Sequence, residues 1–368
     1  MGSIFGKNLK ISVFGESHGS AIGVVIDGLP SGYDINNDII SREMGRRRPI
    51  SEVYSTARKE ADEVEVLSGI NNGKTTGTPV CAIIRNKDCK SDDYNDMKCH
   101  LRPGHADFSG FVRYKGYNDI KGSGHFSGRL TAPVVFAGAV ASQILEVFDI
   151  AIGSHIDSIF NFNDLRFYGT QISKDQLIML RSMDIPVNDR SCRETYLEII
   201  REAKNKSDSV GGIVETAIIG LSAGIGSPIF DCVEAKLSSI LFSIPAVKGV
   251  EFGEGFGMTR LYGSEANDSF YIKDGNICTR TNNNGGINGG ITNGMPVVFR
   301  TAVKPTSSIS KEQDTVDVKK GINSKLKVKG RHDACIVPRV VPVIDAAAAI
   351  AILDLLLEHY GLEGFNNR

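Results

Sequence analysis

The chain lacks several features that mark whole classes of protein. Its 368 residues contain no tryptophan and 7% aromatic residues, and 42 basic residues against 43 acidic ones leave a net charge of −1. A general nucleic-acid binder is more often strongly basic, so any anion-binding site in this chain must be a local cluster of charge. The longest apolar runs, at 132–141 and 346–357, are shorter than the ~18–20 residues needed to span a bilayer.

Two further absences concern the compartment. The seven cysteines include no CxxC pair, which indicates reduced thiols rather than a disulfide framework. The N-terminal residues MGSIFGKNLK lack the apolar region of a signal peptide. We therefore expect a cytoplasmic, globular protein that does not enter a membrane.

Glycine is the residue that the chain has in excess, with 40 copies, or about 11% against a usual ~7%. There is no Gly-X-Y period, so the excess indicates tight turns and close approach of the backbone to a ligand. Two glycine-rich segments still fail as nucleotide motifs. Residues 69–75 have three residues between the glycines where a P-loop needs four, and 253–257 lack the GxGxxG spacing.

Three pairs of similar segments occur in the same order along the chain. They are 28–32 with 220–224, 70–80 with 287–297 (identical at seven of eleven positions), and the apolar runs that open at Pro133 and Pro342. We interpret them as a degenerate duplication within a single domain, 1–368. The repeats would cover about 10–150 and 208–360, with an inserted or elaborated segment at about 151–207.

Both repeats predict the same order of elements. Each has an apolar strand near its start, a glycine-rich turn, a helix, and further strands that include 79–85 or 296–303. Each then closes with a long apolar helix, at 133–148 or 342–359, with proline in its first turn. Strict βαβα alternation is absent. The sequence therefore predicts an α+β fold, an internally duplicated sandwich with helices packed between antiparallel β-sheets.

Arginine, serine and histidine gather in short glycine-rich segments. GESHG (15–19) follows an apolar strand and would place a hydroxyl and an imidazole on a tight turn, although a purely structural capped turn could have the same sequence. GRRRP (45–49) ends a predicted helix. Its guanidiniums suit an anion, but a solvated helix end or a nucleic-acid contact stays open.

Further segments of this kind precede the two apolar helices. RPGHADFSG (102–110) and KGSGHFSGR (121–129) precede the first, and GRHDACIVPR (330–339) precedes the second. Imidazole is readily poised as an acid or base near neutral pH. His105 and His125 lack metal-ligand spacing, so no metal is expected.

The last two segments suit a phosphate or a planar polar ring. NNNGGINGGITNG (282–294) offers backbone amides and carboxamides, and KPTSSI (304–309) offers an amine and three hydroxyls. If the repeats pack about a pseudo-twofold axis, the His and Arg clusters meet in one cleft. That cleft would suit a polyanionic small substrate and a phosphorylated cofactor.

These segments, together with SIPAVKGVEFG (243–253), resemble the chorismate synthase family in this order from about residue 5 to 358. The resemblance implies a carbon–oxygen lyase of the shikimate pathway. Its substrate, 5-enolpyruvylshikimate 3-phosphate, loses phosphate from C3 and hydrogen from C6 by 1,4-anti elimination. The resemblance also implies reduced FMN (FMNH2) and a homotetramer. The net charge and the short apolar runs predict no nucleic-acid or membrane partner. We expect an external flavin reductant, although intrinsic NADPH-dependent reduction stays open.

The resemblance assigns roles to matching residues. His18 would protonate or stabilise the leaving phosphate, His105 would govern protonation of the reduced flavin, and Asp333 would help to deprotonate its N5, which removes the C6 hydrogen. The substrate anions would be held by Ser17, Arg47, Arg129, Arg331 and Arg339. The flavin would be held by His125, Phe126, Ser127, Pro245, Ala246, Gly289, Lys304, Pro305, Thr306, Ser307, Ser308 and Arg331.

The chain departs from the family pattern at three positions. Val53 and His125 stand where many members have arginine, and Ala334 replaces the proline of GRHDPC. The first two weaken the expected anion and flavin contacts, whereas the third should loosen a turn. The alternative function is a non-catalytic flavin- or phosphate-binding protein on the same fold.

Overall fold

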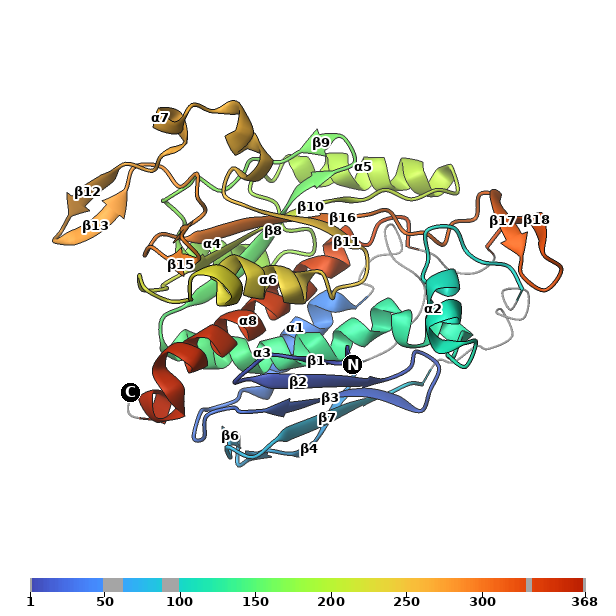
Figure 1. Ribbon diagram of the computed structural model, residues 1–368, viewed down its shortest axis with the longest axis horizontal. Helices are drawn as coiled ribbons and strands as arrows, with labels where there is room; N and C mark the ends of the chain where they lie inside the picture. Colours follow the sequence, from blue (N-terminus) through green and yellow to red (C-terminus); the bar gives the residue numbers. More distant parts are fainter. Residues whose placement is uncertain (1, 49–61, 88–98, 329–332, 367–368) are drawn as a thin grey trace.

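The protein is built from two antiparallel β-sheets with a layer of helices between them (Figure 1). The computed structural model describes residues 2–48, 62–87, 99–328 and 333–366. Helices packed between antiparallel sheets confirm the predicted α+β class.

Each sheet has five strands. The first consists, in spatial order, of β1 (Ile4–Phe5), β2 (Lys10–Gly15), β3 (Ala21–Asp27), β7 (Val80–Arg85) and β4 (Val64–Ser68). The second consists of β11 (Val247–Phe252), β16 (Val297–Val303), β10 (Gly212–Ile219), β8 (Ala151–Ile159) and β9 (Phe162–Asn163). β-Branched residues are frequent in the central strands, as expected for strands packed on a core.

Four small hairpins lie outside these sheets. They are β5 (Ile70–Asn71) with β6 (Lys74–Thr75), β12 (Phe270–Lys273) with β13 (Asn276–Thr279), β14 (Ile287–Asn288) with β15 (Ile291–Thr292), and β17 (Gln313–Asp317) with β18 (Ile322–Leu326).

The helix layer contains the two long apolar helices that the sequence predicts. It consists of α1 (Asn37–Arg47), α3 (Thr131–Val147), α6 (Val233–Leu241) and α8 (Val337–Asn366) (Figure 1). By length and composition, Gly128–Val147 and Val337–Phe365 could each cross a membrane, but 78% and 100% of their most apolar stretches are buried inside the protein. Here they form the core between the sheets.

The remaining helices lie around this core. On the far side of the second sheet are α4 (Lys174–Arg181) and α5 (Cys192–Asn205) (Figure 1). The others are α2 (Asp107–Tyr114), α7 (Gly263–Ala266), η3 (Lys121–Phe126), η4 (Gly128–Leu130), η5 (Ile229–Asp231) and η6 (Gly255–Arg260).

The start of the closing helix differs from the sequence prediction. We expected Pro342 in the first turn of the closing helix, but α8 begins at Val337 and Pro342 lies inside it. A proline in a helix removes one hydrogen bond to the residue four positions earlier, which here is Pro338. The earlier start brings Arg339 into the first turn of α8, beside the candidate site.

Equivalent parts of the proposed repeats make equivalent contacts. The Gly32 amide donates to Thr75 O (2.7 Å) and the Gly224 amide to Thr292 O (2.9 Å). The Thr75 hydroxyl donates to the Pro30 carbonyl, and the Thr292 hydroxyl donates to the Ser222 carbonyl, both at 2.7 Å. These contacts support the duplication that we propose. In sheet order β8 takes the position of β2, so the second repeat is better drawn from Ala151.

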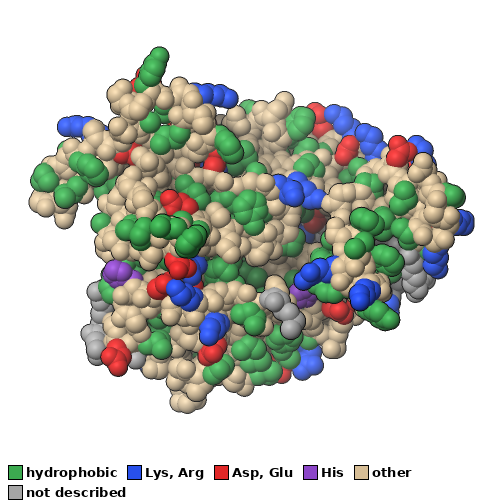
Figure 2. Space-filling model, viewed as in Figure 1, with side chains coloured by type: hydrophobic (Ala, Val, Ile, Leu, Met, Phe, Trp, Pro, Cys, Tyr) green, Lys and Arg blue, Asp and Glu red, His purple; other side chains and the backbone are tan. Residues whose placement is uncertain are grey.

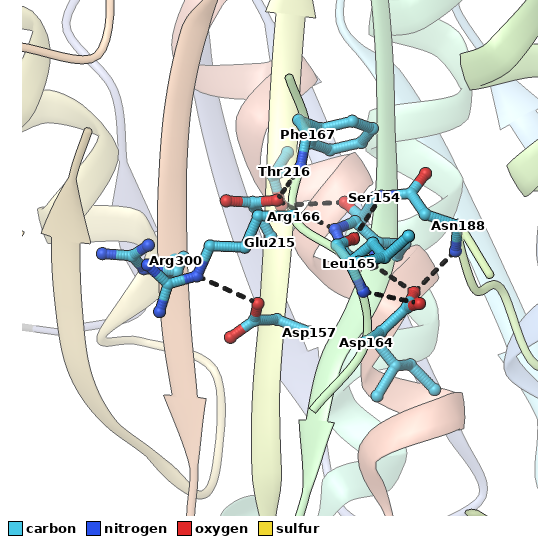
Figure 3. A network of polar contacts seen from close by, with 12 residues as sticks. Ser154, Asp157, Asp164, Leu165, Arg166, Phe167, Asn188, Glu215, Thr216 and Arg300 are labelled. Carbon is cyan, nitrogen blue, oxygen red and sulfur yellow. Dashed lines mark hydrogen bonds and ion pairs between the residues drawn. The ribbon is translucent and has the colours of Figure 1, made fainter. Parts of the chain in front are cut away.

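A polar network holds the segment after β8 against the outer face of the second sheet (Figure 3). His155 Nδ1 lies 3.1 Å from Asp164 and its Nε2 lies 2.9 Å from Glu215, with the imidazole fully buried. Asp164 also accepts the backbone amides of Asn188 (2.6 Å) and Asp189 (2.9 Å). This segment was expected to be an elaboration, and in the structure it covers the sheet.

Candidate active site

Loops at one end of the helix layer bring most of the predicted residues together. The C-terminus of α1 and the N-terminus of α8 lie at this end. They meet the turn after β2, the 102–107 loop, η3, η4 and the loop after β16 there. In the space-filling view, Lys, Arg and His side chains gather around a hollow beside α2 (Figure 2).

Two predicted substrate arginines share one buried carboxylate. Arg47 Nη2 donates to Asp62 Oδ2, and Arg129 Nη1 donates to Asp62 Oδ1 at 2.5 Å. Exposure is 5% for Arg47, 6% for Arg129 and 4% for Asp62. Burial alone would raise the pKa of Asp62, but the two guanidiniums lower it below its usual value. Asp62 belongs to none of the recognised motifs, and no sequence pattern pointed to it.

A third arginine adds positive charge to this pair. Arg339 Nη1 donates to Asp333 at 2.6 Å, and Arg339 Nε donates to the Arg47 carbonyl at 3.1 Å. Burial lowers the pKa of Arg47, and the charges of Arg339 and Arg129 lower it further against the opposing effect of Asp62. Arg47 Nε is buried without a hydrogen-bond partner among the described residues. The cluster is therefore suited to receive another anion.

Two adjacent arginines of GRRRP, Arg46 and Arg47, differ in role. Arg46 Nη1 donates to Glu43 (2.6 Å) and to Asp345 of α8 (2.9 Å), and it packs α1 against the core. Burial alone would raise the pKa of Glu43, but Arg46 and Arg181 lower it to about 2. Arg46 is thus structural, and Arg47 faces the site.

Asn86 ties the arginine cluster to the GESHG turn. Its Oδ1 accepts from Arg129 Nε at 2.7 Å, and its Nδ2 donates to the carbonyls of Glu16 (3.0 Å) and Gly19 (2.8 Å). The backbone of Ser17 and His18 is therefore fixed relative to Arg129.

The other side of this turn lies against η3. The Ser17 amide donates to Gly124 O at 3.1 Å. Gly122 has a φ of +57°, and a Cβ there would overlap the His18 ring and lie 2.9 Å from Ser17 Oγ. Ser17 Oγ is buried without a hydrogen-bond partner among the residues that the structure describes. Both side chains of the predicted Ser17–His18 pair thus border Gly122.

His105 lies in a second group of charges on the same side of the protein. Its Nδ1 is 2.6 Å from Asp107 Oδ1, and Arg102 donates to both Asp107 oxygens, from Nε at 2.8 Å and from Nη2 at 2.7 Å. Arg102 also reaches Ser123 Oγ of η3 at 3.1 Å. This contact connects the His105 group to the segment that borders His18.

The predicted flavin loop, 304–308, lies against the His105 loop. Lys304 Nζ donates to Gly104 O, and the Lys304 amide donates to Ala246 O at 2.9 Å, beside Pro245. Ser308 Oγ accepts from Arg102 Nη1 at 3.4 Å. The hydroxyl of Thr306 is buried without a hydrogen-bond partner within the described ranges. Between Lys304 and Ser308 the loop also contains Pro305 and Ser307.

Several predicted flavin residues have structural contacts. The Phe126 ring lies 6.2 Å from that of Tyr114, and a Cβ on Gly110 of α2 would lie 2.6 Å from it. Ser127 Oγ accepts from the Arg129 amide at 3.3 Å and caps η4. The exposed His125 ring has Nδ1 2.9 Å from Gly15 O.

Two predicted site residues, Gly289 and Arg331, and the departure Val53 are not among the residues placed at this end of the helix layer. Gly289 lies in the turn between β14 and β15, at the end of the helix layer opposite α2 (Figure 1). The flavin contact that the resemblance implies for Gly289 stays a prediction. Arg331 and Val53 lie outside the described residues.

Comparisons with known proteins agree over nearly the whole chain. A family model described as chorismate synthase matches residues 9–357. A chorismate synthase of Thermococcus kodakarensis is 45% identical over 359 residues, which cover 98% of this chain and 99% of the relative. One of Methanosarcina barkeri is 46% identical over 357 residues, covering 97% and 96%.

A solved structure agrees with the sequence relatives. A crystal structure described as chorismate synthase has a TM-score of 0.76 and 28% identity, and covers 98% of this chain and 96% of its own. The segments GESHG, RPGHAD, KPTSSI and GRHDAC all lie within the matched range. The chain therefore belongs to the chorismate synthase family.

Proposed function

We propose that this enzyme converts 5-enolpyruvylshikimate 3-phosphate into chorismate by 1,4-anti elimination of phosphate, as a carbon–oxygen lyase of the shikimate pathway. The observation that carries the proposal is the buried cluster of Arg47, Arg129 and Arg339, which contacts Asp62 and Asp333 within the described residues and lies next to the Ser17–His18 turn. The substrate has two carboxylates and a phosphate. Planar guanidiniums bind both groups with two hydrogen bonds each.

His18 and Ser17 act on the leaving phosphate in this proposal. Negative charge grows on the bridging oxygen as the C3–O bond breaks, and a donor already in place stabilises that charge. His18 supplies an N–H donor, and the Ser17 hydroxyl is buried with donor capacity that the described residues leave unused. Asn86 keeps both fixed relative to Arg129.

The residues present fit reduced FMN as the cofactor. Lys304, Ser307 and Ser308 offer an amine and hydroxyls, and the buried Thr306 hydroxyl lacks a partner in the described part of the chain, as expected if a ligand supplies one. When bound there, reduced flavin would supply electron density toward the breaking C3–O bond and a basic nitrogen for the C6 proton. Arg331 would add charge to both ligands, and we keep it as a proposed contact.

His105 and Asp333 manage protons beside the flavin in this proposal. Asp333 is held by Arg339 at 2.6 Å, so a proton-accepting carboxylate lies next to the arginine cluster. His105 lies beside the 304–308 loop through Arg102, which contacts both Asp107 and Ser308. The two acid–base groups thus approach the proposed flavin site from different loops.

The proposal extends to the location, the assembly and the flavin source of the enzyme. We propose a cytoplasmic homotetramer that receives reduced flavin from an external reductant, without a nucleic-acid or membrane partner. NADPH-dependent reduction by the chain itself is the alternative source. Release of phosphate with NADPH and oxidised FMN, in the absence of another reductant, would favour that source.

Anaerobic turnover tests the reaction. The enzyme is mixed with 5-enolpyruvylshikimate 3-phosphate and dithionite-reduced FMN, and chorismate absorbance and released phosphate are followed together. We expect both products in equal amounts, none with oxidised FMN, and a large loss with His18→Ala. If the folded protein binds FMN but releases no phosphate, it is a non-catalytic flavin- or phosphate-binding protein.

A further inference from the structure

One carboxylate beside His105 has no part in the roles proposed above. Asp107 Oδ1 lies 2.6 Å from His105 Nδ1, and Asp107 is the first residue of α2. Arg102 binds both carboxylate oxygens, from Nε at 2.8 Å and from Nη2 at 2.7 Å. This two-point contact fixes the plane of the carboxylate, because guanidinium and carboxylate match in geometry.

The distances determine which ring nitrogen carries the proton. His105 Nδ1 has two polar neighbours, Asp107 Oδ1 at 2.6 Å and Arg102 Nη2 at 3.1 Å. An ionised carboxylate only accepts, so the short contact needs a proton on Nδ1. Burial alone would raise the pKa of Asp107, but the hydrogen bonds of Arg102 and His105 lower it well below its usual range. Asp107 is therefore ionised, and Nδ1–H donates to it.

We propose that Asp107 is a positioning residue, which Arg102 holds so that neutral His105 carries its proton on Nδ1 and exchanges protons through Nε2. The mechanistic part of this inference rests on the proposed function, in which His105 manages protons beside the flavin. An imidazole with a fixed tautomer and a fixed ring plane presents one nitrogen to its reaction partner. A hydrogen bond from the other ring nitrogen to a carboxylate commonly fixes both in functional histidines.

The contacts of Arg102 extend the argument to the rest of the site. The guanidinium also reaches Ser123 Oγ of η3 at 3.1 Å and Ser308 Oγ at 3.4 Å. Arg102 is 8% exposed, so its charge is compensated by Asp107 rather than by solvent. The pair thus places the His105 ring relative to both the loop that borders His18 and the proposed flavin loop.

Nitrogen NMR on histidine-labelled protein tests the tautomer without turnover. His105 is assigned by the loss of its signals in His105→Gln, and spectra are recorded at alkaline pH, above the ordinary pKa of an imidazole. In the wild type we expect a protonated Nδ1 and an unprotonated Nε2. In Asp107→Ala we expect the ring to change to a mixture of both tautomers.

Asp314→Asn is the control, because Asp314 is an exposed carboxylate of β17 that pairs with Lys325 at 2.9 Å. It should leave the His105 signals unchanged. A wild-type His105 with its proton on Nε2 would overturn the proposal, as would an Asp107→Ala spectrum identical to that of the wild type. If Asp107→Ala fails to fold, the wild-type spectrum still decides.

Kinetics separate this inference from the proposed function. Asp107→Ala should lower kcat about 10- to 100-fold with little change in KM for the substrate, because a positioned acid or base contributes about 10²- to 10⁴-fold. An unchanged kcat with an altered tautomer would contradict the role of Asp107 in the reaction. Absence of turnover in the wild type would instead refute the proposed function and leave the tautomer result intact.

Discussion

At the scale of single residues, the site depends on side chains that the motifs do not include. Asp62 compensates Arg47 and Arg129, and Asn86 connects Arg129 to the GESHG turn. Neither residue has a sequence pattern of its own. Their importance arises because two buried guanidiniums need a counter-charge wherever the chain can supply one.

Replacing the shared carboxylate should destabilise the protein. Asp62→Asn leaves two buried guanidiniums undercompensated, and breaking a buried ion pair costs about 3–5 kcal/mol. We expect a lower Tm in a thermal melt, with partial recovery when inorganic phosphate is added as a replacement anion. Asp34→Asn, which removes an exposed pair with Lys74, is the control and should change little. An unchanged Tm for Asp62→Asn would mean that the bridge contributes no stability.

Gly122, which borders the side chains of Ser17 and His18, should be essential for activity. Gly122→Ala places a methyl group on the His18 ring at a φ of +57°, and a displacement of about 1 Å at a reacting group can cost about 100-fold in rate. We therefore expect kcat to fall by about that factor. Gly128→Ala in η4 is the matched control, since a Cβ there meets no atom within 4 Å in the described part of the chain. Equal activity of both variants would contradict the placement of His18.

At the scale of elements, the site depends on how closely α3 and α8 cross. Gly138 of α3 lies against Ala346 of α8, where a Cβ on Gly138 would overlap the alanine. The small residues let the two backbones approach, and the N-terminus of α8, with Arg339, is thereby placed beside Arg47 of α1. The helix crossing therefore sets the position of the arginine cluster.

An added methyl group at this crossing should separate the helices. Gly138→Ala forces a shift in a packed core, which typically costs about 1–3 kcal/mol. We expect a lower midpoint in urea unfolding and a weaker affinity for the substrate. In Gly45→Ala of α1, the added Cβ meets no atom of the described residues within 4 Å. This variant should instead raise stability by about 0.5–1 kcal/mol, because alanine favours the helix. If Gly138→Ala is as stable as the wild type, the crossing tolerates more volume than the structure indicates.

At the scale of the whole molecule, the segment after β8 is held to the second sheet by charge. Burial alone would lower the pKa of His155, but its hydrogen bonds to Asp164 and Glu215 raise it above the ordinary value. Burial alone would raise the pKa of Asp164, and hydrogen bonds from His155 and from backbone amides lower it. Both shifts favour the charged pair in the folded protein.

These shifts predict how stability depends on pH. The contribution of His155 is fully present below its unfolded pKa of about 6.5 and is lost as pH rises through the higher folded value. The contribution of Asp164 is present above about pH 3.9 and is lost as pH falls through its lower folded value. Urea unfolding from pH 5 to 9 should therefore show an alkaline loss of stability that is smaller in His155→Asn. An identical alkaline slope in the two proteins would exclude His155 as its source.

The sequence predicted the fold class because local patterns were strong. The buried helices are apolar on nearly every side, and β3, β7, β10 and β16 lie where apolar runs were found. The predicted start of α8 was wrong by five residues, because Pro342 lies inside the helix and not in its first turn. Proline usually marks a helix start, and the sequence alone does not reveal that the residues before it are helical too. The duplication stays a proposal, supported by the paired threonine contacts.

The sequence alone determined the family, the α+β class and the set of segments that carry the chemistry, because these depend on residue types in a fixed order. It could not assign partners to the arginines: Arg46 and Arg47 are adjacent in one helix, yet one pairs with Asp345 and the other with Asp62. Nor could it place Gly289 apart from the loops around His18 and His105. Only the tertiary structure decided these points, since charge pairing and burial depend on which distant segments the helix layer and the two sheets bring together.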